Sequence, residues 1–69
     1  MPYYRSALFD RAEYDPFEQR LLLWFSGSVD PYAYDGVPPR VWTGLQAASS
    51  KGAYFARHIR NRYEGHKSV

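Results

Sequence analysis

Cysteine is absent from the 69-residue sequence, which excludes a disulfide framework and most kinds of zinc site. A chain of this length forms one small domain and has too few residues for a core plus an enclosed active-site cleft. We therefore expect a single domain that is stabilised by packing alone. The lack of cysteine also fits a reducing compartment.

Long hydrophobic runs are absent as well. No apolar stretch approaches the roughly 18 residues of a membrane span, and the N-terminal MPYYRSA lacks the apolar centre of a signal peptide. These features predict a cytoplasmic protein that has no membrane partner.

Catalytic and metal-binding side chains are scarce. His58 and His66 are the two histidines, and a histidine on an exposed helix face or in a polar tail is more often solvated than catalytic. Asp10, Glu13 and Asp15 are close in sequence, but strand alternation would place Asp10 and Glu13 on different faces. No glycine-rich strand-to-helix turn of the nucleotide-binding type is present. We expect no enzymatic activity, no cofactor and no metal ion.

Aromatic residues, by contrast, are abundant: 2 Trp, 7 Tyr and 4 Phe, each of which can bury about 150–250 Å² in a core. Charge is unevenly distributed. Residues 1–50 carry four basic side chains against six acids, and residues 51–69 carry five against one. This concentration of positive charge favours an anionic partner, although a solvated helix face gives the same pattern and is commoner.

Three strands are predicted in the first half of the chain. Residues 7–14 alternate weakly, with Phe9 out of step as at a β-bulge. Asp15-Pro16 marks the turn that follows, because proline fixes the backbone and aspartate bonds to the residues beyond it. Arg20–Phe25 is the central strand, and Tyr32–Tyr34 is the third.

Two helices follow the strands. Val37-Pro38-Pro39 leads into the first, because proline is tolerated in a first helical turn. Its inner stripe consists of Val41, Trp42, Leu45 and Ala48. Gly44 is predicted on its outer side.

The second helix is predicted to begin at Lys51, after a cap from Ser49 or Ser50, and to continue to Tyr63. At about 100° per residue, its core side carries Gly52, Phe55, Ala56, Ile59 and Tyr63. Its opposite side carries Tyr54, Arg57, His58 and Asn61, with Arg60 and Arg62 on the flanks.

Together these elements predict an α+β fold: a three-stranded antiparallel meander followed by two helices packed on one face. The domain would span residues 6–63, with flexible ends at residues 1–5 and 64–69.

A spaced set of residues resembles the pattern of a known family. It comprises Tyr14-Asp15, Tyr32-Ala33-Tyr34, Val37-Pro38, Ser50-Lys51-Gly52, Phe55, Ile59-Arg60 and Tyr63. From about residue 6 to residue 63 the chain resembles the KTSC domain, which is named for the C-terminal domain of some bacterial lysyl-tRNA synthetases and also occurs as a free-standing small bacterial protein. The attachment to a synthetase implies RNA binding as an expectation. Leu22 and Trp24 depart from the family pattern, which has polar outward residues in this strand.

The favoured interpretation is a small non-catalytic nucleic-acid-binding module, with RNA as the expected ligand. The predicted contact residues are Ser50, Lys51, Tyr54, Arg57, His58, Arg60 and Arg62 on the last helix and Tyr32 and Tyr34 on the third strand. The N-terminus of this helix, at Ser50 and Lys51, suits a phosphate, although a plain helix cap at a tight corner is commoner. Tyr32 and Tyr34 could stack on unpaired bases, although paired tyrosines on a strand more often belong to a core.

The alternative is a protein-interaction or self-association module. Leu22 and Trp24 point away from Leu21 and Leu23, so the central strand is apolar on both faces. Two helices cover one face of a sheet, and an uncovered apolar face would bind a second copy or another protein. Salt separates the two hypotheses, because phosphate binding weakens steeply with salt and apolar association does not.

Overall fold

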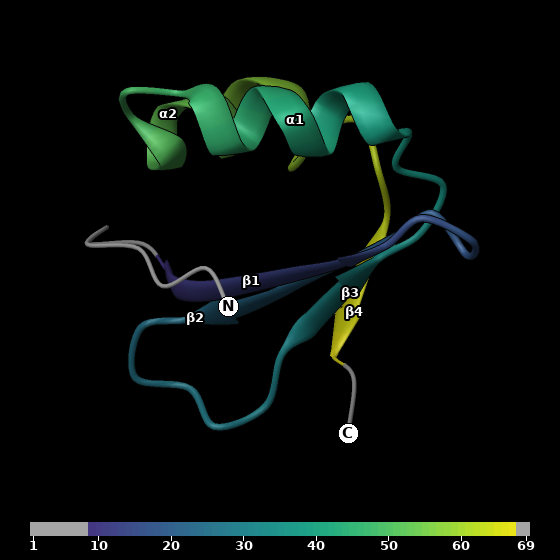
Figure 1. The fold of residues 1–69 in the computed structure, drawn as a ribbon. Helices are drawn as coiled ribbons and strands as arrows, with labels where there is room; N and C mark the ends of the chain where they lie inside the picture. The colour runs from purple at the N-terminus through teal and green to yellow at the C-terminus, as the bar shows by residue number, and fades with distance from the viewer. Residues whose placement is uncertain (1–8, 68–69) are drawn as a thin grey trace.

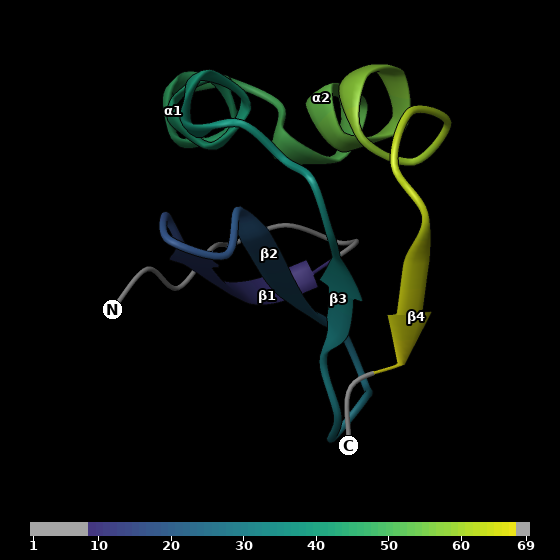
Figure 2. The same ribbon diagram turned by 90° about the vertical axis from the view of Figure 1, so that its right-hand side faces the viewer.

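The computed structural model describes residues 9–67 and shows a two-layer α+β domain. In chain order its elements are β1 (Phe9–Asp15), β2 (Arg20–Phe25), β3 (Tyr32–Tyr34), α1 (Pro39–Ala47), α2 (Lys51–His58) and β4 (Gly65–Lys67). The strands form one antiparallel sheet in the order β1-β2-β3-β4. Both helices lie over one face of this sheet (Figures 1 and 2). The predicted class and the placement of the helices are confirmed.

The sheet has four strands, where the sequence predicted three. Gly65–Lys67, expected to be part of a flexible end, forms β4 and pairs antiparallel with β3. Gly65 is opposite Tyr34, and a Cβ atom at residue 65 would lie 2.3 Å from the Tyr34 ring. The glycine therefore leaves space for the Tyr34 ring. The sequence did not predict β4, because a strand of three exposed residues shows no hydrophobic alternation. The expectation for residues 1–5 lies outside the described residues.

The second helix is shorter than predicted, because α2 ends at His58 and does not continue to Tyr63. The backbone leaves the helical conformation at Ile59, where φ is −122° and ψ is −53°. The N–H of Tyr63 still donates to the carbonyl of Ile59 at 3.0 Å, so residues 60–63 form a turn. This turn carries the chain back toward the sheet and into β4 (Figure 2). Within the described residues, neither α1 nor α2 has the length and apolarity needed to span a membrane.

The core lies between the sheet and the helices and is built around aromatic rings. Phe55 of α2 makes edge contacts with Phe9, Phe25 and Tyr34 at centroid distances of 6.1, 5.6 and 5.6 Å. Fully buried aliphatic side chains complete it: Leu21, Leu23, Val37, Leu45 and Ile59. The predicted bulge is confirmed, because the β1–β2 register shifts between Phe9 and Arg11. Leu21 and Leu23 of the central strand and Phe55 and Ile59 of the second predicted helix are buried, as predicted.

Candidate nucleic-acid interface

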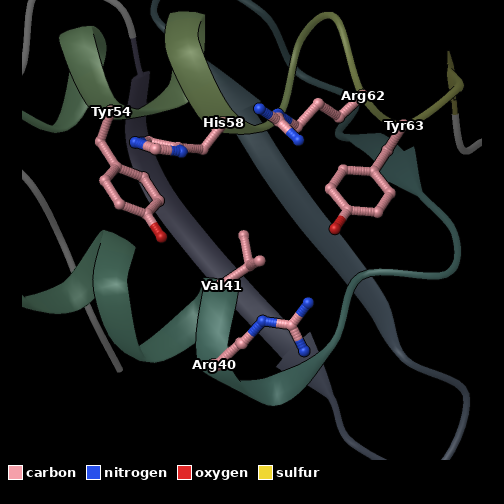
Figure 3. Close-up of a pocket in the computed structure, with 6 residues that line it drawn as sticks. All are labelled: Arg40, Val41, Tyr54, His58, Arg62 and Tyr63. Atoms are coloured by element: carbon pink, nitrogen blue, oxygen red, sulfur yellow. The ribbon is translucent and has the colours of Figure 1, made fainter.

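The helix layer carries two adjoining hollows on its surface. The first has a volume of about 290 Å³ and is lined by Arg40, Val41, Tyr54, His58, Arg62 and Tyr63 (Figure 3). The second, of about 250 Å³, lies at the start of α2 and is lined by Ala48, Ser49, Ser50, Ala53, Tyr54, Arg57 and His58. Both hollows share Tyr54 and His58, whose ring centroids are 4.4 Å apart. These two rings form a ridge that separates the hollows.

Tyr54 is fixed in this ridge by packing against the first helix. A Cβ atom at Gly44 would lie 2.1 Å from the Tyr54 hydroxyl oxygen, so the phenol ring crosses α1 at its glycine. Tyr54 is half-buried and packs against the core. The prediction that Tyr54 is on the exposed side of α2 and Gly44 on the outer side of α1 was therefore wrong. Helical periodicity places a residue on one helix and carries no information about the neighbouring helix that covers it.

Positive charge dominates both hollows, and none of the residues described by the structure brings a carboxylate into either of them. Arg40, Arg57 and Arg62 form no ion pair with an acid within residues 9–67. All three side chains are exposed. A guanidinium group in this condition can donate paired hydrogen bonds to phosphate oxygens from a ligand.

Ser50 and Lys51 have structural roles at the corner between the helices. The Ser50 hydroxyl accepts a hydrogen bond from the N–H of Ala53 at 3.3 Å, which confirms the predicted cap. The Lys51 ammonium donates to the carbonyls of Gln46 and Ala48 at 3.2 and 2.9 Å. It thereby satisfies carbonyls that the end of α1 leaves without helical partners. Lys51 thus lies outside the two hollows, while Ser50 lines the second.

Arg60 and the two strand tyrosines lie apart from the hollows. Tyr34 is 7% exposed and belongs to the core, and burial raises the pKa of its phenol. Tyr32 is 38% exposed and packs edge-on against Phe25 at 5.5 Å. The Arg60 guanidinium lies 6.0 Å from the Phe55 ring centroid. The structure therefore does not bring these three side chains together with Arg57, His58 and Arg62.

The outer face of the sheet carries the other predicted contact residues, Leu22 and Trp24. Both are half-buried, and the Arg11 guanidinium covers the Trp24 ring at 4.4 Å from its centroid. Arg11 also forms an ion pair with Glu13 on the same strand. The apolar surface predicted here is consequently smaller than the sequence indicated.

Arg40 was missed by the sequence analysis. It is the only charged residue of α1, and the packing of α1 beside α2 brings it to Arg62. A signal was present, however. Residues 36–63 contain five basic side chains and no acidic one, so the whole helix layer, and not the last helix alone, is cationic.

Within the described part of the chain, no group of three histidine or acidic side chains is placed to hold a metal ion. The hollows contain hydroxyl, imidazole and guanidinium groups, which can bind and orient an anion.

Comparison with known proteins assigns the family. The model of the KTSC domain matches residues 5–63. The chain belongs to the KTSC domain family. A protein from Tsukamurella paurometabola is 40% identical over 58 residues, covering 84% of this chain and 85% of the relative. The crystal structure of a KTSC domain protein from Yersinia pestis has a TM-score of 0.90 at 28% identity, covering 99% of this chain and 94% of that one.

Several of the residues that carry the KTSC resemblance form hydrogen bonds that stabilise the fold. The Tyr14 hydroxyl donates to the Val37 carbonyl at 2.5 Å and so ties β1 to the segment before α1. The Asp15 carboxylate accepts from the N–H groups of Phe17 and Glu18 at 2.9 and 3.2 Å, which closes the β1–β2 turn. Together with the Ser50 cap, these hydrogen bonds connect or terminate secondary-structure elements, which explains why these residues occur in the KTSC pattern. None of the three arginines that line the hollows, Arg40, Arg57 and Arg62, belongs to the KTSC pattern.

Proposed function

We propose that this KTSC domain is a non-catalytic nucleic-acid-binding module and that its ligand is single-stranded RNA. The observation that carries the proposal is the group of three arginines, Arg40, Arg57 and Arg62, around the two hollows. Among residues 9–67, none of the three forms an ion pair with an acid and no carboxylate lines either hollow. Such a surface attracts phosphate groups through charge and through paired hydrogen bonds.

The ridge between the hollows supports a single strand over a duplex. Tyr54 and His58 present aromatic rings between two cationic hollows, so phosphates on either side would place a base beside the rings. Unpaired bases stack on aromatic side chains, whereas bases in a duplex are already stacked on each other.

Salt dependence gives a direct test with fluorescence anisotropy. If Arg40, Arg57 and Arg62 each neutralise one phosphate, log K should fall against log salt with a slope of about −0.7 × 3, or roughly −2. A short single-stranded RNA, a structured tRNA and a duplex DNA should be titrated at low salt, and the single strand should bind most tightly. Failure of all three to bind at tens of micromolar protein would reject the proposal.

A matched pair of substitutions locates the surface. Arg57→Ala removes one charge from the helix layer and should reduce the slope by about 0.7. Arg20→Ala removes one charge from the sheet and should leave affinity within twofold. Equal losses in the two variants would show that net charge, and not this surface, drives binding.

Self-association through Leu22 and Trp24 is the competing outcome. Because Arg11 covers the Trp24 ring, less apolar surface is available for it. Sedimentation of the wild type and of Trp24→Lys would detect it. A salt-insensitive dimer that this substitution converts to a folded monomer would favour the competing function.

A further inference from the structure

The first hollow brings together nitrogen-bearing side chains from three separate segments. Arg40 comes from the start of α1, His58 from the last turn of α2, and Arg62 from the turn beyond it. Figure 3 shows Arg62 between His58 and Tyr63 on one side, Arg40 on the opposite side, and Val41 between them. The site is therefore assembled by tertiary packing and does not follow from one helix face.

We propose that this hollow is a phosphate-monoester site. Under the proposed function, on which this inference rests, its ligand is the terminal phosphate of a nucleic-acid strand. An internal phosphodiester carries one negative charge, while a monoester carries about −1.5 to −2 near neutral pH and exposes three strong acceptor oxygens. The two guanidinium groups match the charge of the monoester better than that of the diester, and the imidazole adds a hydrogen-bonding group.

The position of Arg40 supports a bound anion. The first turn of α1 contains no acidic residue, and a cation there faces the positive end of the helix dipole. Arg62 shares the hollow with Arg40, and no acid within residues 9–67 pairs with either. Like charges repel across this space, and a dianion between them would turn the repulsion into attraction.

The size and lining of the hollow fit the end of a strand. At about 290 Å³ it is at the lower limit of ligand pockets, so it holds a phosphate with part of a sugar and not a whole oligonucleotide. The Tyr54 and Tyr63 rings flank it and can contact the terminal nucleoside. The remaining nucleotides would then cross the ridge toward the second hollow at Arg57.

The test compares single-stranded RNAs of one sequence that carry a 5′-phosphate, a 3′-phosphate or hydroxyl groups at both ends, each with an internal fluorophore. We expect one phosphorylated form to bind at least fivefold more tightly than the hydroxyl form. Arg40→Gln and Arg62→Gln should each abolish this preference. Arg57→Gln, in the other hollow, should weaken all three RNAs and preserve the preference.

Two further ligands test the phosphate-monoester site separately from the proposed nucleic-acid binding. Adenosine monophosphate should compete with the phosphorylated RNA, and adenosine should not. Equal affinity for all three RNAs would overturn the monoester site and leave the nucleic-acid function intact. Binding of adenosine monophosphate without binding of any RNA would support the site and overturn the nucleic-acid function. No binding of any ligand would overturn both.

Discussion

The arginines of the two layers have different partners. In the sheet, Arg11 forms an ion pair with Glu13, and the Nε of Arg20 donates to Asp35 at 2.8 Å. In the helix layer, Arg40, Arg57 and Arg62 have no acidic partner within residues 9–67. The charges of Arg11 and Arg20 are therefore compensated within the protein, whereas within residues 9–67 the charges of Arg40, Arg57 and Arg62 are not.

The difference originates in the sequence and is completed by the fold. Strand alternation places Arg11 and Glu13 on the same face, and the loop after β3 brings Asp35 to Arg20. Residues 36–63 offer no acid at all, so no local pairing is available to the arginines there. Uncompensated charge that persists in a folded surface is a better guide to a binding site than net charge alone.

The largest expected effect is on the free energy of unfolding, and it contrasts a buried residue with an exposed one in the segment of α2 and the following turn. Ile59 is fully buried, and Ile59→Ala should lower the free energy of unfolding by about 2–4 kcal/mol through loss of packing and cavity formation. Arg57 is exposed and forms no ion pair within residues 9–67, so Arg57→Ala should change the free energy of unfolding by less than about 0.5 kcal/mol. Urea denaturation of both variants measures this, and comparable losses would show that Arg57 is held by contacts within the protein.

A second prediction concerns the contact between Tyr54 of α2 and Gly44 of α1. Gly44→Ala improves helix propensity by about 1 kcal/mol, but its Cβ would meet the Tyr54 ring. The substitution should therefore stabilise the Tyr54→Ala variant by about 1 kcal/mol and the wild type by clearly less. Urea denaturation of the wild type, the two single variants and the double variant measures this difference as a double-mutant cycle. An identical gain in both backgrounds would mean that the ring does not rest on α1.

The smallest effect concerns the paired arginine of the sheet. The hydrogen bond from Arg20, with a further contribution from His66, holds the pKa of Asp35 below its ordinary value. Because the folded-state pKa is the lower one, this stabilisation is present above about pH 4 and is lost as pH falls through the folded-state pKa. Asp35→Asn should flatten that part of the stability profile. Denaturation midpoints between about pH 5 and 2.5 test it, and an unchanged profile would show that the pair contributes nothing in solution.

Much of the fold was predictable because local signals agreed with tertiary packing. The bounds of β2 and β3 and the start of α2 follow from apolar alternation, proline position and the Ser50 cap. The end of α2 was not predictable from periodicity, because Tyr63 keeps helical spacing while the backbone has already turned at Ile59.

The candidate site was predictable only in part. Arg57, His58 and Arg62 were found from the charge of the last helix. The contribution of Arg40 depends on how α1 packs beside α2, and the half-buried position of Tyr54 depends on Gly44. These are distances between helices, which a one-dimensional pattern does not contain.

The fourth strand has a practical consequence for the family boundary. The KTSC match ends at residue 63, and β4 lies just beyond it at Gly65–Lys67. A fragment cut at that boundary would leave the N–H and C=O groups of β3 without the partners that residues 65–67 provide. An open edge of this kind recruits other chains by strand addition. Such a fragment would therefore form dimers or aggregates that result from the truncation and could be mistaken for a natural oligomer.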